Sequence, residues 1–453
     1  MTLARRIARS VLAALLALLT SAASAHLMPN SVISLDFDRH AVQAEILMPM
    51  SELAYGSGHR LSLNAASGLG AERPFVTRYV LDHLAVRGPD GRPWSVAIRS
   101  MTIASDSWNT DIGTTVVLTP PPGASARRFT LAWSGIIDRV ANHFVLVFAR
   151  SDFATGTLAS APEMIGGLQG ATRTIAIDRG QGSAWRGFAA SLRLGMEHIA
   201  EGHDHLLFLI ALLLPAPLLP AGRRWGSYGG ARRTIRRLAL IVSAFTLGHS
   251  ITLIGGAFLG WQLPQRPVEV GIALSILLSA LHAWRPIFRG REPLIAAGFG
   301  LVHGLAFATV IGNFRLEPLA KAQSILGFNL GIELVQLLVV AAVLPLLLML
   351  APMRIYAPFR SAGAAFAGFA ALAWIEERIT GLPNGVGDAV DALLGKAPWL
   401  VLAATLVLLL HRWLRIGGVQ PRAASARLAG LCVLAAGAFA NLMAATLAGP
   451  MPG

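Results

Sequence analysis

The sequence contains a single cysteine, Cys432, among its 453 residues. One cysteine excludes an intramolecular disulfide, and it also excludes an iron–sulfur cluster or a metal site built from several cysteines. Charged residues are scarce as well: they make up 14% of the chain, whereas 54% is hydrophobic and the mean hydropathy is +0.58. This composition is typical of an integral membrane protein and not of a soluble domain.

Acidic residues are fewer than basic ones: the chain has 24 Asp and Glu and 38 Lys and Arg, which gives a formal net charge of +14. The arginines lie between apolar runs, as they do when basic cytoplasmic loops orient a membrane protein. This placement argues against nucleic-acid binding. The chain also lacks a G-x-x-x-x-G-K-[ST] motif, so we do not expect it to bind ATP for transport.

Residues 1–25 resemble a secretory signal peptide. Arginines near the start precede an apolar core at 11–19, and the small residues 23–25 form a cleavage site. Cleavage after Ala25 would make His26 the new N-terminus, where its amine and imidazole would chelate copper or nickel. An uncleaved anchor, or a histidine that merely follows the cut, is the alternative.

Residues 26–185 predict a small, mostly β, sandwich-like domain outside the cytoplasm. The stretches 32–37 and 42–47 alternate apolar and polar residues as half-buried strands do, and residues 72–83 fit one amphipathic helix. About seven strands are expected in total. No catalytic motif is present in this region, and its isolated histidines are expected on the surface or in packing: His59, His83 and His143.

The rest of the chain predicts a membrane bundle of about eight transmembrane helices. The apolar runs are 203–221, 238–260, 268–284, 293–312, 324–350, 361–376, 397–411 and 428–448. Arginine-rich loops alternate with arginine-poor ones, and the positive-inside rule places the rich loops in the cytoplasm. We therefore expect a multi-pass protein of the bacterial inner membrane with a periplasmic N-terminal domain, a core at 186–380, and two additional C-terminal helices at 381–453.

The most unusual stretch is 195–214, where ionisable residues run directly into an apolar segment. A charge at bilayer depth costs at least about 2.5 kcal/mol, so these groups are expected at a membrane interface or in a protein-lined cavity. On one continuous helix, His198 and His205 would share a face with Glu201 between them.

Imidazole beside carboxylate is a ligand set for zinc, nickel, iron or copper. The metal ligands predicted in this stretch are His198, Glu201, Asp204 and His205. Neighbouring His203 would point to the other side and is expected to be incidental.

Polar side chains recur within the later apolar runs, where they must satisfy one another or line a wet path. The predicted transport path consists of His249, Ser250, Thr252, Glu269, His303, Asn329, Glu333 and Gln336. His282 is expected to make a helix–helix hydrogen bond, and the same alternative stays open for His249. The pairs Gly300/Gly304 and Gly327/Gly331 predict close helix contacts.

These motifs resemble the HupE/UreJ family of membrane proteins. The match consists of H-x5-D-H at His198, Asp204 and His205, followed by F-T-x-x-H-S-I-T-L, H-G-L-x-F-A and F-N-L-G-I-E-L-x-Q, and it covers about 190–380. The resemblance implies a permease for nickel or cobalt. It also implies that His198, Asp204 and His205 are metal ligands, with His249, His303 and Glu333 along the path. The N-terminal domain and the last two helices depart from this pattern.

The sequence therefore predicts a permease, rather than an enzyme, that moves a divalent transition metal inward. Nickel is the first choice, with zinc, cobalt or copper as alternatives. Metal binding needs deprotonated imidazole, so uptake should weaken as pH falls through the histidine range. Two other functions fit the same residues: an intramembrane metal-dependent hydrolase, and a non-transporting assembly or sensor protein whose β domain binds a periplasmic partner. The expected partners are the metal ion and the lipid bilayer.

Overall fold

The computed structural model describes residues 30–61, 69–105, 110–261, 263–312, 316–397, 399–401, 403 and 405. The expected signal peptide, His26, the apolar run 428–448 and most of the run 397–411 lie outside these residues. The chain divides into two compact units. The first contains most of the residues before 179 and is mainly strands; the second contains the helices after residue 179 together with Asp36–Asp38 and Ala149–Glu163.

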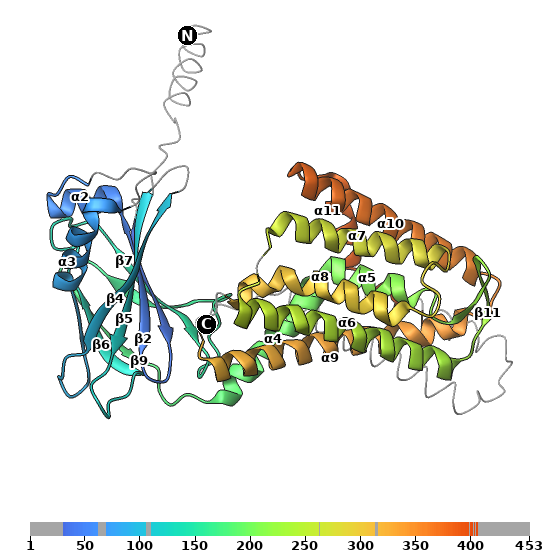
Figure 1. Ribbon diagram of the computed structural model, residues 1–453, viewed down its shortest axis with the longest axis horizontal. Helices are drawn as coiled ribbons and strands as arrows, with labels where there is room; N and C mark the ends of the chain where they lie inside the picture. The colour runs from blue at the N-terminus through green and yellow to red at the C-terminus, as the bar shows by residue number, and fades with distance from the viewer. Residues whose placement is uncertain are drawn as a thin grey trace, which may run out of the picture. The chain divides into compact units, whose positions relative to one another are not determined.

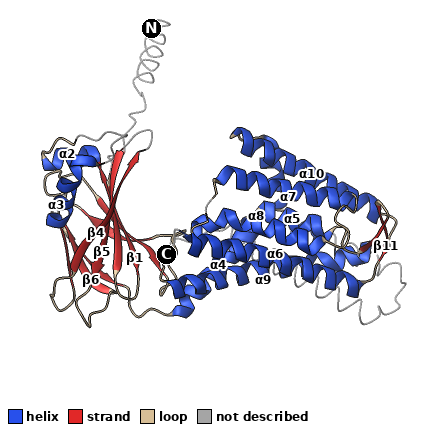
Figure 2. Cartoon of the chain, viewed as in Figure 1, coloured by secondary structure: helices blue, strands red, loops and turns tan. Residues whose placement is uncertain are grey.

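The N-terminal region consists mainly of two β-sheets (Figures 1 and 2). Six strands form one sheet in the order β4-β5-β2-β1-β7-β8, and three form the other in the order β3-β6-β9. The strands are β1 (Ser31–Phe37), β2 (Val42–Pro49), β3 (Leu84–Arg87), β4 (Ser95–Ser105), β5 (Thr110–Thr119), β6 (Arg128–Trp133), β7 (Val145–Asp152), β8 (Glu163–Leu168) and β9 (Thr174–Asp178). The prediction of a β-rich region is confirmed.

The strands follow the alternation of the sequence. In β2, every second residue from Val42 is buried, and β2 pairs antiparallel with β5 from Val42 opposite Leu118. Two of the nine described strands had no clear alternation to predict them: β3 has only four residues, and β8 contains the pair Gly166–Gly167. The described residues of this region also form two α-helices, α2 (Met50–Ser57) and α3 (Arg73–His83), the latter close to the predicted 72–83.

His143 is a packing residue with 1% of its surface exposed. Its Nε2 lies 2.9 Å from the Ser31 hydroxyl, and its Nδ1 lies 3.6 Å from the Glu52 carboxylate. Burial disfavours the charged imidazolium and lowers the pKa of His143 to about 4. Between this value and the ordinary pKa of 6.5, the unfolded chain binds a proton that the folded chain does not.

We therefore expect the N-terminal region to lose stability as pH falls from about 6.5 towards 4. The loss between pH 7 and pH 5 should be about 2 kcal/mol from this group. Hydrogen exchange of β1 and β7 peptides in the full-length protein measures it, with His143→Gln as control. As the pH is lowered, the protection of these amides should decrease more steeply in the wild type than in the variant. Equal pH dependences in the two proteins would contradict the assignment to His143.

The second unit contains eight described α-helices. They are α4 (Ala184–Glu201), α5 (His203–Leu213), α6 (Ala231–Leu259), α7 (Gln265–Trp284), α8 (Glu292–Gly312), α9 (Pro318–Leu350), α10 (Tyr356–Thr380) and α11 (Gly385–Leu394). Within the described residues, α6, α7 and α9 are long and apolar enough to cross a membrane, and α5 and the first part of α8 are shorter apolar helices. This is a membrane protein with several candidate spans. The described residues do not show the full number of about eight spans that the sequence predicts.

Two details of the predicted helices are wrong. The stretch 195–214 is not one helix, because the chain leaves helical geometry at Gly202, where φ is −74° and ψ is 84°. The run 203–221 is helical only to Leu213, and a short hairpin follows, formed by β10 (Leu218–Ala221) and β11 (Arg224–Tyr228). Pro215, Pro217 and Pro220 explain the early end, because proline disrupts helix continuation.

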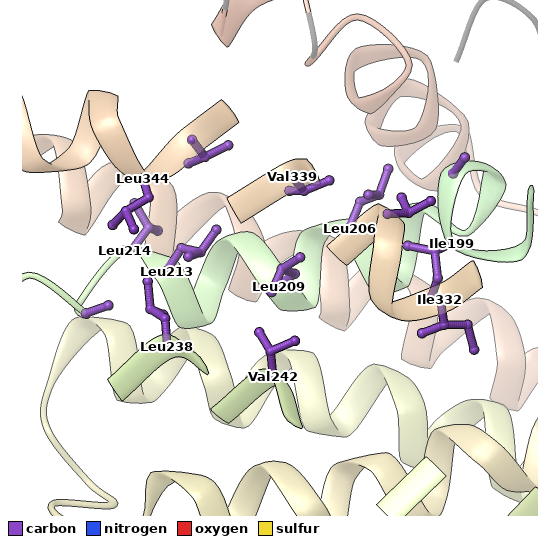
Figure 3. Packing of buried hydrophobic residues seen from close by; sticks show 14 of the residues in the cluster. Ile199, Leu206, Leu209, Leu213, Leu214, Leu238, Val242, Ile332, Val339 and Leu344 are labelled. Carbon is purple, nitrogen blue, oxygen red and sulfur yellow. The ribbon is translucent and has the colours of Figure 1, made fainter. Parts of the chain in front are cut away.

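Helix α5 is a central element of this unit. All but three of its eleven residues are buried, and Leu209 and Leu213 belong to one cluster with Leu238 and Val242 of α6 and Val339 of α9 (Figure 3). The apolar run of α5 is therefore explained by protein packing as much as by lipid. Its first turn, which carries Asp204 and His205, is held inside the bundle by the same contacts.

Glycines bring two pairs of helices into backbone contact. A Cβ atom at Gly331 of α9 would collide with the carbonyl of Leu192 in α4, and one at Gly300 of α8 would collide with the carbonyl of Phe245 in α6. The predicted close contacts at these small residues are thus present, and they join α4 to α9 and α6 to α8.

Large apolar side chains remain exposed along the outside of the long helices. A soluble protein rarely exposes a continuous apolar surface of this kind, whereas lipid covers it in a membrane. The exposed residues include Ile235, Leu247, Ile251 and Phe258 of α6, Leu274 and Leu281 of α7, Leu326 and Leu337 of α9, and Phe369 and Leu372 of α10.

Candidate metal site

The break at Gly202 folds the ends of α4 and α5 against each other. The Gly202 amide donates to the carbonyl of His198 at 3.1 Å, and the Gly202 carbonyl accepts from Leu206 at 3.1 Å. A side chain at Gly202 would approach both the His198 carbonyl and the His205 ring. The turn consequently places the rings of His198 and His205 with their centroids 4.8 Å apart.

Two further helices add an imidazole each. The His303 ring of α8 lies 4.8 Å from the His205 ring, and the His249 ring of α6 lies 6.4 Å from the His198 ring. We call these four residues the histidine cluster. His249 and His303 expose none of their surface and His205 exposes 7%, so bulk water does not solvate these rings.

Five ring nitrogens of the histidine cluster are buried and lack a hydrogen-bond partner among the described residues. They are Nε2 of His198, Nε2 of His205, both nitrogens of His249 and Nδ1 of His303. A buried polar atom without a partner costs about 1–3 kcal/mol, so most such atoms in proteins are paired. Five of them in one cluster therefore require a physical reason.

Hydrogen bonds fix the tautomer of two of the rings. Asp204 Oδ1 lies 2.8 Å from His205 Nδ1, and a carboxylate only accepts, so Nδ1 carries the proton and Nε2 keeps its lone pair. The single proton of Ser275 goes to the carbonyl of Ile272 at 2.7 Å. His303 Nε2 must then donate to Ser275 Oγ at 2.9 Å, which leaves the lone pair on Nδ1. In both neutral rings, the free lone pair is on the nitrogen without a partner.

Asp204 is the orienting group of the cluster. One of its oxygens accepts from His205, and the other lies 3.5 Å from Arg378 Nη2 at the end of α10. A carboxylate behind an imidazole fixes the ring and raises its basicity as a ligand. His203 is also engaged, since its Nδ1 lies 3.1 Å from the Asp391 carboxylate of α11.

Phenylalanine rings surround the histidine cluster. Phe307 and Phe328 stack on each other and lie 4.8 and 5.4 Å from the His198 ring, and Phe208 and Phe245 each lie 5.2 Å from the His303 ring. These rings exclude water, which strengthens electrostatic interactions inside the cluster.

Three other residues of the predicted transport path lie on α9. Asn329 lies within reach of the His249 ring but without hydrogen-bond geometry to either ring nitrogen, and its amide donates to the carbonyl of Ile325 at 3.0 Å. Gln336 follows Asn329 by seven residues, on the same face of α9, and accepts from Thr246 at 3.3 Å. Glu333, which lies between Asn329 and Gln336 in the sequence, is partly buried.

Four predicted residues are not brought into the histidine cluster. Ser250 and Thr252 donate to backbone carbonyls of their own helix, at 2.7 Å to Thr246 and 3.0 Å to His249. Glu269 accepts from Gln265 at 2.6 Å, and Glu201 is exposed.

His282 has a structural role distinct from the cluster. Its Nδ1 accepts from the backbone amides of Ile287 and Phe288, both at 3.1 Å. It therefore ties the end of α7 to the following loop. Its Nε2 lies 4.0 Å from the Glu292 carboxylate of α8, which is too far for the helix–helix hydrogen bond expected from the sequence.

In this structure the side chains of the histidine cluster do not form a closed set of metal ligands. Across the ranges that the structure describes, no three His, Cys, Asp or Glu side chains are arranged so as to hold a metal ion. The fold and these residues define a multi-helix membrane protein with an imidazole-rich interior.

Comparison with protein families gives the class a name. Residues 173–378 match the HupE / UreJ protein family, so the chain contains a HupE/UreJ domain, with an additional N-terminal region before it. The expected resemblance is confirmed, and the family implies a membrane protein of the nickel/cobalt transporter type. No curated protein and no solved structure matches the chain.

Proposed function

We propose that this protein is a permease that moves nickel or cobalt across the membrane through the histidine cluster. The observation that carries the proposal is the group of five unpartnered imidazole nitrogens at the meeting point of four helices. Imidazole is a preferred ligand for nickel, cobalt, zinc and copper, and a bound cation would satisfy lone pairs that otherwise remain buried and unpaired.

Ring spacing supports binding of one ion by neighbouring histidines. Two imidazoles on a shared tetrahedral ion, at about 2.1 Å per metal–nitrogen bond, have ring centres roughly 5 Å apart. The His198–His205 and His205–His303 spacings are both 4.8 Å. Small side-chain rotations would therefore close the site, and the reverse rotations would release the ion, as transport requires.

The arrangement suggests separate roles for the predicted ligands. His198 and His205 would take the ion first, and exposed Glu201 would attract it at the entrance. Asp204 would orient His205 and compensate the charge of the ion. His249, Asn329, Glu333 and Gln336 would continue the path along α6 and α9, with His303 on the opposite side of the cluster.

The proposal includes the topology derived from the arginine distribution. Region 26–185 would be periplasmic, region 186–380 would be the transporting core in the inner membrane, and region 381–453 would complete the bundle. The ion would then enter from the periplasm. The ligand of the β-rich region, copper or nickel binding by a mature N-terminal His26, and a periplasmic partner are further parts of the same hypothesis.

Flux into liposomes tests the proposal. The purified protein would be reconstituted with a metal-sensitive dye inside the vesicles, and Ni²⁺, Co²⁺ or Mg²⁺ would be added outside. Saturable entry of Ni²⁺ or Co²⁺, without entry of Mg²⁺, is the expected result. Stoichiometric metal that binds and never enters would refute transport and favour the metal-dependent hydrolase.

Replacement of Asp204 by asparagine should weaken metal binding without unfolding the protein. Asparagine keeps the shape but lacks the charge, so His205 loses a charged acceptor and Arg378 loses its anion. Loss of such an orienting carboxylate costs about 10–100-fold in metal affinity. Titration with Ni²⁺ measures the change, and Asp388→Asn on α11 is a matched control. Equal affinities in the two variants would contradict this role of Asp204.

A further inference from the structure

A basic pocket lies beside the turn of the β10–β11 hairpin and the end of α7. Figure 1 shows this hairpin at one end of the helical unit, and the hairpin follows the end of α5 that is opposite Asp204 and His205. Its volume is about 720 Å³, and its polar lining consists of Arg223, Arg285 and Arg289. Arg223 belongs to the hairpin turn, and the other two follow α7 directly. The pocket is separate from the histidine cluster and shares no residue with it.

Nothing acidic neutralises these arginines in the described part of the chain. None of the three makes a hydrogen bond or ion pair through its side chain to a described residue. The three helix connections at this end contain no Asp or Glu in residues 214–230, 285–291 and 351–355. The nearby Glu292 is already engaged by Arg237 at 2.5 Å.

Arg360 is another basic residue at this end, and its side chain has a structural role. Arg360 of α10 donates to the carbonyls of Ala283 and Trp284, the last residues of α7. Trp225 of β11 donates to the carbonyl of His282 at 3.0 Å. These bonds fix the end of α7 and the hairpin relative to each other, so the pocket wall is built by specific contacts and not by loose surface side chains.

Apolar side chains complete the pocket on its lipid side. Leu281, Trp284 and Ile287 line it and are each about half exposed. Trp284 is the last residue of a candidate membrane span, where tryptophan commonly marks the boundary between hydrocarbon and headgroups. The site thus offers guanidinium groups at headgroup depth directly beside surface suited to acyl chains.

We propose that this pocket binds the phosphate of an anionic phospholipid. Guanidinium groups bind phosphate oxygens in pairs of parallel hydrogen bonds, and a bound anion relieves the mutual repulsion of three unpaired arginines. Basic pockets among membrane helices on the cytoplasmic side are known to take lipid headgroups. The apolar lining favours a lipid over free phosphate, because free phosphate would leave Leu281, Trp284 and Ile287 unused.

Native mass spectrometry of the full-length protein tests this site. The protein would be incubated with phosphatidylglycerol, with phosphatidylcholine, or with inorganic phosphate. Phosphatidylglycerol should be retained in preference to phosphatidylcholine. Conversion of Arg223, Arg285 and Arg289 to glutamine should lower its retention at least about tenfold. The control variant removes the same charge from exposed positions of α6 outside the pocket: Arg232, Arg233 and Arg236 to glutamine.

Equal loss in the two triple variants would show general charge attraction and overturn the proposal. Displacement of the lipid by millimolar phosphate, with no preference between the two lipids, would identify a free-anion site and also overturn it. A second measurement uses the fully folded wild type, in case the triple variant does not fold. Brominated phosphatidylglycerol should quench more fluorescence in the wild type than in Trp284→Phe, whereas equal quenching would contradict a lipid at this pocket.

Discussion

Substitution of His205 by alanine is expected to abolish metal flux through the reconstituted protein. Among the described histidines, His205 is the one whose ring contacts both His198 and His303, and the Asp204 contact at Nδ1 leaves its Nε2 available for a ligand. Removal of an orienting group alone costs about 10–100-fold in affinity, so loss of the ligand itself should cost about a hundredfold or more in Ni²⁺ flux.

The control for this experiment is another buried histidine on a neighbouring helix. His282 accepts two backbone hydrogen bonds through Nδ1, and the Oδ1 of asparagine reproduces that acceptor. His282→Asn should therefore retain most of the flux. Comparable losses in His205→Ala and His282→Asn would mean that the cluster has no special role in transport.

Substitution of Gly331 by leucine should destabilise the helical unit strongly. The new side chain would meet the backbone of Leu192 and Met196 in α4, and backbone atoms cannot move aside as a flexible side chain can. Overpacking costs about 1–3 kcal/mol in well-packed cores and more where backbones must separate. The expected fall in melting temperature is about 10 °C. Because α4 carries His198, binding of Ni²⁺ should weaken as well.

Gly298 of α8 provides the matched control, since a Cβ atom there would meet nothing within 4 Å. Leucine at this exposed helical position should leave the melting temperature unchanged or raise it, because leucine has the higher helix propensity. Thermal unfolding of both variants in detergent decides the matter. The α4–α9 contact would be incorrect if Gly331→Leu and Gly298→Leu had the same melting temperature.

The broad plan of the fold could be predicted because it depends on local patterns. Alternation along residues such as those of β2 predicts strands. The apolar run 238–260 predicts the end of α6 to within one residue, whereas α6 begins earlier, at Ala231, in the arginine-rich segment before the run. The hairpin β10–β11 and helix α11 were not predicted. The hairpin begins within the last residues of the run 203–221, which has no polar side chain after His205, and α11 is a short helix in a segment assigned to a loop.

The residues of the histidine cluster could be selected from the sequence, but their mutual arrangement could not. His198 and His205 are near each other because the chain breaks at Gly202, and not because a continuous helix aligns them. His249 and His303 join them through helix packing at glycines, which is a tertiary property.

Supporting residues were missed for the same reason. Ser275 sets the tautomer of His303, and Arg378 holds Asp204, yet each is an ordinary residue within its own helix. An arginine near the end of an apolar helix was the one available signal for Arg378. The orienting role of Asp204 depends on a contact of 2.8 Å that spacing alone does not define.

X-ray absorption at the nickel edge of the purified protein, loaded with one equivalent of Ni²⁺, tests the central claim most directly. Imidazole ligands give a characteristic multiple-scattering pattern that distinguishes them from carboxylate or water oxygen. We expect at least two imidazole ligands in the wild type and fewer in the double variant His205→Ala/His303→Ala. A first shell made only of oxygen, or a spectrum that is identical in the variant, would contradict it.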